Sequence, residues 1–224
     1  MTVDRSGEPD LANSLAHAIE DYRATWHPVD CELYDICRRR PSQRTFADVY
    51  TKVAIIGRVY AAGISRTVQV DGDPEAAVAR GLVEQAGLID QMLQTLVDSQ
   101  LDRTAASKII ELHARVARGL LPHTGGTWQQ SFVSKYLHFH CNVVPVYDSR
   151  AEAAIGRFVN WSAVYSARHT IGHPADWLTR YYNFATAFVV LYERAAAATL
   201  IQPTVKEVDY LLWQPAQSER HPSE

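Results

Sequence analysis

Helical periodicity is the feature that most limits how this chain can fold. Apolar residues recur three or four positions apart along nearly all of it, which is the spacing of an amphipathic helix. Between positions 46 and 60, for example, Phe46, Tyr50, Val53 and Ile56 fall on one helical face. Only residues 66–70 alternate in the manner of a strand, and that run is short. The sequence therefore predicts an all-α, multi-helix globular domain with about eight or nine helices.

Capping and breaker residues place the limits of these helices. A side-chain acceptor just before an apolar run, with proline at the first helical position or a Glu or Gln three residues on, is typical of a helix start. Such starts are Asp73 before Pro74, Thr127 with Gln130, and Thr204 with Glu207. The predicted helices cover residues 11–25, 31–37, 45–63, 73–100, 104–121, 127–140, 148–160, 174–198 and 203 onward.

Length and composition favour one domain. The 224 residues are 47% hydrophobic and 21% charged, so one core can bury most of the apolar surface. We expect a disordered start at 1–10, a helical domain at 11–213 and a polar tail at 214–224. The net charge of −3 disfavours a protein that coats nucleic acid by bulk charge, although a local basic groove is compatible with it.

Cysteine content and hydropathy bear on the compartment. Cys31, Cys37 and Cys141 form an odd, sparse set without a CxxC motif, which fits reduced thiols in a cytosol. The first ten residues are polar rather than signal-like, and no apolar stretch is long enough to span a bilayer. We therefore expect a cytoplasmic protein without membrane contact.

The segment 121–154, LPHTGGTWQQSFVSKYLHFHCNVVPVYDSRAEAA, has the most informative layout. It combines a glycine-containing turn, a helix, an extended V-P-V-Y run and an aspartate, Asp148, at a helix start. Backbone N–H groups at a helix N-terminus can hold a phosphate, which makes Gly125, Gly126 and Thr127 candidate phosphate-binding residues.

This layout resembles the helix-hairpin-helix DNA glycosylase superfamily. Leu121, Pro122 and Gly125 match its hairpin, and Pro145 and Asp148 match the segment that carries its essential aspartate. More similar still is a group of bacterial proteins with an 8-oxoguanine-glycosylase-like fold. These have a helix like residues 131–137 and then an extended segment ending in Asp-x-Arg, which correspond here to Lys135, Asp148 and Arg150.

The resemblance implies a DNA-binding protein that excises a modified base without a cofactor. Asp148 would stabilise the cationic sugar or orient a water, and Lys135 would be a nucleophile if burial lowered its pKa. The target base would have to flip out of the duplex. The remaining substrate-binding candidates are Trp128, Tyr136, His138 and Arg150, with Phe139 as a further stacking partner.

Departures from the family pattern leave a non-catalytic alternative open. His123 replaces the first hairpin glycine, the position of the Schiff-base lysine falls near Thr127, and Tyr147 is an extra residue before Asp148. The fold would then serve to bind nucleic acid, a protein partner or a second copy of the chain, as in a bacterial defence or regulatory system. In that case Asp148 is a helix cap, Lys135 a solvated lysine and the aromatic residues are core.

Histidines and basic runs give two weaker hypotheses. A His-dependent metal-binding enzyme would draw its ligands from His138, His140, Cys141, His169 and His173, although no HExxH motif is present. Basic residues that could meet phosphates, or simply face solvent, are Arg38, Arg39, Arg40, Arg44, Lys52, Arg58, Arg66, Lys108, Arg115 and Arg118.

Overall fold

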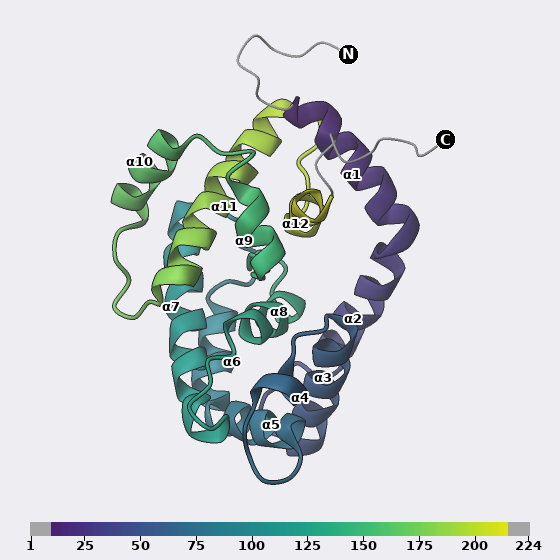
Figure 1. Cartoon of the computed structure of the whole chain (residues 1–224), viewed down its shortest axis with the longest axis vertical. Helices are drawn as coiled ribbons and strands as arrows, with labels where there is room; N and C mark the ends of the chain where they lie inside the picture. Colours follow the sequence, from purple (N-terminus) through teal and green to yellow (C-terminus); the bar gives the residue numbers. More distant parts are fainter. Residues whose placement is uncertain (1–9, 215–224) are drawn as a thin grey trace.

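A computed structural model describes residues 10–214, and this part of the chain is an assembly of α-helices (Figure 1). It contains twelve α-helices, one short 3₁₀ helix and no strand. The first six helices are α1 (Leu11–Thr25), α2 (His27–Arg39), α3 (Phe46–Val59), α4 (Ile64–Thr67), α5 (Pro74–Glu84) and α6 (Ala86–Gln94). The others are α7 (Arg103–Gly119), α8 (Gln130–His140), α9 (Ser149–Ile155), α10 (Trp161–Ile171), α11 (Thr179–Ala198) and α12 (Val205–Trp213), with the 3₁₀ helix η1 (Leu121–His123) after α7.

The all-α prediction is confirmed, and several local signals act as expected. The Asp73 side chain accepts a hydrogen bond from the Ala76 N–H at the start of α5. Thr204 and Glu207 form a complete capping box at the start of α12. Residues 1–9 and 215–224, which include most of the expected disordered start and polar tail, lie outside the described residues.

Other local predictions are wrong, including the count of eight or nine helices. Residues 64–67 form a short helix, α4, which was not predicted from the sequence. The expected helix 73–100 is divided at Gln85, whose side chain donates to carbonyl oxygens of α5 and α7. Tertiary packing here overrides a continuous apolar pattern. The helix expected from Thr127 begins at Gln130 without a side-chain cap, and α11 begins at Thr179 rather than at Pro174.

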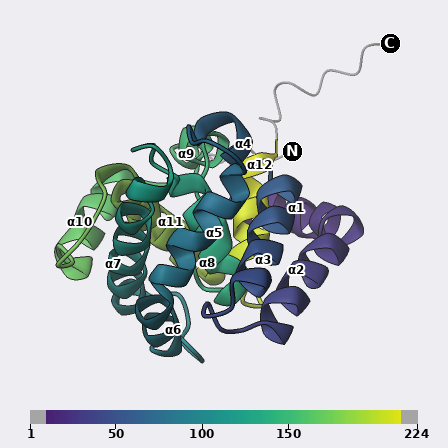
Figure 2. The ribbon, with the colours of Figure 1, turned by 90° about the horizontal axis from the view of Figure 1, so that it is seen from below.

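Helix α8 forms the centre of the molecule and positions the residues discussed below. Every residue from Phe132 to Phe139 is buried, and α8 packs against α2, α3 and α7. It lies near the middle of the molecule in two perpendicular views (Figures 1 and 2). Helix α12 packs against α1, α9 and α11. Any polar side chain on α8 must therefore find its partners inside the protein.

No described helix is both long enough and apolar enough to cross a membrane.

Candidate active site

Lys135 lies on α8 with only 3% of its surface exposed, so it is not the solvated lysine that the non-catalytic alternative predicts. Its ammonium group donates to the Ser131 hydroxyl at 3.0 Å and to the Tyr60 carbonyl oxygen at 3.4 Å. Burial lowers the Lys135 pKa, while the charges of Asp148 and Asp209 oppose that effect. Lys135 is therefore a buried amine that has anionic groups close by.

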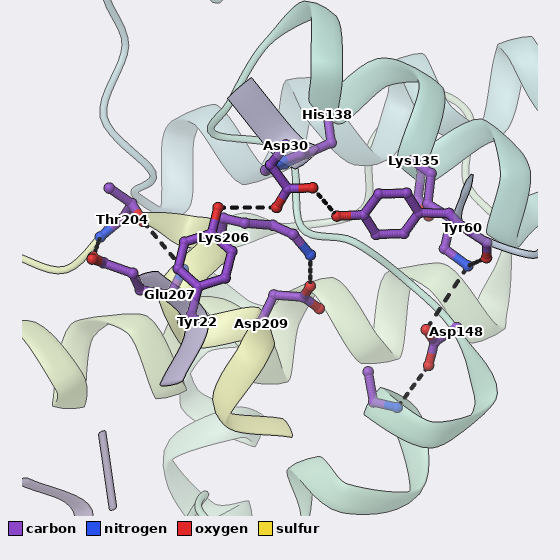
Figure 3. Close-up of polar contacts among 12 residues, drawn as sticks. Tyr22, Asp30, Tyr60, Lys135, His138, Asp148, Thr204, Lys206, Glu207 and Asp209 are labelled. Carbon is purple, nitrogen blue, oxygen red and sulfur yellow. Dashed lines mark hydrogen bonds and ion pairs between the residues drawn. The ribbon is translucent and has the colours of Figure 1, made fainter. Parts of the chain in front are cut away.

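Asp148 faces Lys135 from the start of α9, and this pair is the centre of the site (Figure 3). One oxygen, Oδ1, accepts from the backbone N–H groups of Arg150 and Ala151 at 2.9 Å each, so the expected cap is present. The other, Oδ2, is 3.8 Å from Lys135 Nζ and has no hydrogen-bond partner among the described residues. The carboxylate thus holds its helix with one oxygen and leaves the other available toward the amine.

Tyr60, the residue that follows α3, connects Lys135 to a further aspartate. Its ring centroid is 5.9 Å from Lys135 Nζ and 4.9 Å from Lys206 Nζ. Its hydroxyl donates to Asp30 on α2, and Tyr22 donates to the other oxygen of Asp30 at 2.9 Å. Burial, with the charge of Asp30, raises the Tyr60 pKa and keeps the phenol protonated.

Helix α12 contributes a second lysine and carboxyl group to the cluster. The Lys206 ammonium donates to Oδ2 of Asp209, three residues further along the same helix. Asp209 is completely buried, and its Oδ1 has no hydrogen-bond partner among the described residues. Together with Asp30, Lys135 and Asp148, these two residues form one buried cluster of two lysines and three aspartates, which come from three helices and the N-cap of α9 (Figure 3). Burying several charged side chains together costs free energy, because each loses its contact with water. Clusters of this kind are frequent at functional sites.

The cluster approaches the surface at Asp148, whose side chain is 12% exposed. Arg150, two residues on, is exposed, and its guanidinium lies 5.3 Å from the ring centroid of Trp213. Among the four substrate-binding candidates, Arg150 is the one that lies next to Asp148 and is exposed. Trp128 is also exposed, but no contact joins it to the cluster among the described residues.

Two of the predicted substrate-binding residues are instead part of the core. Tyr136 is fully buried and donates its hydroxyl hydrogen to the Gln43 side chain. His138 is fully buried between the Tyr34 hydroxyl, 2.5 Å from Nε2, and the Val144 carbonyl oxygen, 2.7 Å from Nδ1. Burial lowers its pKa to about 3, so His138 is a neutral core residue near neutral pH.

The glycine turn is held mainly by its own backbone. Gly126 N–H donates to the Leu121 carbonyl oxygen at 3.0 Å, and Thr127 N–H donates to the Thr124 carbonyl oxygen at 3.1 Å. Gly125 has a positive φ of 60°, and a Cβ there would lie 2.3 Å from the Gln69 carbonyl oxygen. The turn therefore requires glycine for packing, and two of the N–H groups expected to bind a phosphate are already used.

The other hypotheses from the sequence gain little from the geometry. Within residues 10–214, no three His, Cys, Asp or Glu side chains meet in a way that could hold a metal ion. Many of the basic residues are ion-paired: Arg38 with Asp35, Arg40 with Asp48, Arg44 with Asp90, Arg58 with Glu75, Arg115 with Glu111 and Arg118 with Asp176.

Sequence reasoning found Lys135 and Asp148 and missed Asp30, Tyr60, Lys206 and Asp209. These four come from parts of the chain far from 121–154. Considered alone, Asp30, Lys206 and Asp209 fit the polar face of a helix, and Tyr60 continues the apolar face of the helix predicted at 45–63. One signal was available: Lys206 and Asp209 have the i,i+3 spacing of a helical ion pair. The pattern does not reveal that this pair faces inward.

Comparisons with protein-family models, curated proteins and solved structures gave no match to this chain.

Proposed function

We propose that this protein binds DNA and breaks the N-glycosidic bond of a modified nucleotide, with Lys135 and Asp148 as the reacting pair. The observation that carries the proposal is the 3.8 Å approach of Lys135 Nζ to a carboxylate oxygen of Asp148 that has no hydrogen-bond partner. The resemblance of residues 121–154 to helix-hairpin-helix glycosylases supports it independently.

Each member of the pair has a chemical role in this proposal. The Asp148 carboxylate stabilises positive charge at the sugar C1′ as the bond to the base breaks. Lys135, with a pKa lowered by burial, supplies the free amine that attacks C1′. The nucleotide has to leave the duplex and enter beside Asp148, where the exposed Arg150 would contact a phosphate.

Covalent trapping on abasic DNA tests the role of Lys135. An amine that attacks the aldehyde carbon of an abasic site loses water to form an imine, which borohydride reduces to a stable amine. We expect wild-type protein to give a DNA adduct and Lys135→Gln to give none. Lys108→Gln is the matched control, because Lys108 lies exposed on α7.

Base release tests Asp148 separately. On duplexes that carry oxidised, deaminated or alkylated bases, Asp148→Asn should slow release by at least about 100-fold, since it removes the charge that faces C1′. An adduct that persists in Lys135→Gln, together with unchanged base release by Asp148→Asn, would overturn the proposal.

The burial of Lys135 favours a second candidate, a DNA-binding module without catalysis. An amine that is 3% exposed and already donates two hydrogen bonds can serve to hold α8 against α3. This candidate predicts salt-dependent DNA binding that is unaffected by Asp148→Asn, with neither adduct nor released base.

A further inference from the structure

Asp209 differs from the other fully buried aspartate of the cluster in how its oxygens are satisfied. Both oxygens of Asp30 accept hydrogen bonds from tyrosine hydroxyls. In Asp209, Oδ2 accepts from Lys206, whereas Oδ1 is buried without a hydrogen-bond partner among the described residues. Leaving a carboxylate oxygen unpaired in the interior is expensive, and a proton on that oxygen removes most of the cost.

The titratable groups around Asp209 determine how its pKa is shifted. On its own helix lies Lys206, and the titratable groups of other elements that interact with it electrostatically are Tyr34 of α2, Tyr60 after α3, Lys135 of α8 and Asp148 before α9. Burial raises the Asp209 pKa and the charge of Asp148 adds to this, while Lys206 and Lys135 oppose it.

The two carboxyl groups are therefore set up differently. Asp148 Oδ1 accepts two backbone N–H bonds at the start of α9. Asp209 has one charged donor, Lys206, and one buried oxygen without a hydrogen-bond partner among the described residues, and burial raises its pKa. A carboxyl group whose pKa is raised by burial can keep its proton and act as an acid beside a second carboxyl group.

We propose that Asp209 is a second functional carboxyl group of this site and supplies the proton that the departing base takes up. The inference rests on the proposed function. As the bond between C1′ and the base nitrogen breaks, its electron pair passes to the base, which takes the proton from Asp209 Oδ1. Lys206 balances the carboxylate that remains, and the Lys135 amine forms the new bond to C1′.

Two assays on the same protein separate this role from that of the Lys135–Asp148 pair. Asp209→Asn should reduce base release from a modified duplex by about 100-fold or more, as expected for loss of a general acid. The decline of the wild-type rate at high pH should also disappear. Trapping on a preformed abasic site should stay within about threefold of wild type, because no base has to leave there.

Asp30→Asn is the matched control, since Asp30 is equally buried in the same cluster but has no unpaired oxygen. It should change folding stability without removing the decline at high pH. Should Asp209→Asn fail to fold, carbon-13 NMR of aspartate carboxyl groups in the wild-type chain replaces it, and we expect a protonated Asp209 at pH 7.

The outcomes are distinguishable. Wild-type base release with undiminished release by Asp209→Asn, or an ionised Asp209 at pH 7, overturns the donor role and leaves the proposed function standing. Wild-type protein that gives neither adduct nor released base overturns the proposed function, and the donor role falls with it.

Discussion

Two buried lysines, Lys52 on α3 and Lys135 on α8, differ in how many hydrogen bonds they donate. Lys52 on α3 is fully buried and donates to three oxygens: the Arg40 carbonyl at 2.8 Å, the Gln43 side chain at 2.8 Å and the Ser42 carbonyl at 3.2 Å. Lys135 donates two hydrogen bonds and faces Asp148 at 3.8 Å, beyond hydrogen-bond distance.

The contrast lies in how far the hydrogen-bonding groups around each lysine are paired. Every proton of the Lys52 ammonium has an acceptor, and these acceptors hold the loop between α2 and α3. Burial lowers its pKa to about 8, yet no carboxylate contacts it directly. Around Lys135, hydrogen-bonding capacity remains unused on Asp148 and Asp209. A perturbed lysine pKa alone would thus not distinguish the two sites, whereas unpaired partner atoms do.

Apolar substitution of each lysine is the strongest test of this contrast. Lys52→Met removes the donor to two backbone carbonyls and one of the two donors to Gln43 Oε1, and should lower the free energy of unfolding by about 2 kcal/mol or more. Lys135→Met removes two longer bonds beside the partly exposed Asp148 and should cost about 1 kcal/mol. Urea denaturation at pH 7 measures both. Equal losses would show that Lys135 is as structural as Lys52.

The fold was more predictable than the site because helix periodicity and caps are local. Asp73 and Thr204 act as caps through neighbours three residues away. By contrast, the break at Gln85 depends on its contact with α7. Part of the candidate site was predictable, because Lys135 and Asp148 are only 13 positions apart in the sequence. Tyr60 and Asp209 join them only through the packing of α3 against α8 and of α12 against α9.

Two buried histidines, each near a buried lysine, predict that folding stability falls in acid in both regions. His138 lies near Lys206 and His140 near Lys52, and burial lowers each pKa from 6.5 to about 3. The unfolded chain therefore binds more protons between these values, so stability falls as the pH drops from 6.5 toward 3. Each histidine contributes a slope of about 1.4 kcal/mol per pH unit.

Glutamine variants isolate this effect from the cost of substitution. The stability gap between wild type and His138→Gln, and likewise His140→Gln, should narrow as the pH falls below 6, in urea titrations between pH 7 and 4. If the two stability gaps narrow equally, the two histidines respond to acid in the same way. The regions around Lys135 and Lys52 would then differ only in the surroundings of the lysines. A constant gap would mean that the folded protein protonates these rings as readily as the unfolded chain does.

Substitutions of Asp148 should have the smallest effect on stability, and two variants distinguish the contributions of its two carboxylate oxygens. Asparagine retains an oxygen that can cap α9, so Asp148→Asn should leave the thermal midpoint nearly unchanged. Alanine removes the cap and should cost about 1 kcal/mol. Thermal unfolding of both variants checks this. A large loss for asparagine would show that the attraction to Lys135 is itself a major source of stability.

The lysine distribution also has a practical consequence. The sequence has four lysines. Lys52, Lys135 and Lys206 are buried, whereas Lys108 is exposed. An acylating reagent added to native protein therefore meets Lys108 at once, while the other three side chains react only when their surroundings open. The acylation rate of Lys135 relative to Lys108, followed by peptide mass spectrometry, would report how often the interior becomes accessible to a molecule from solution.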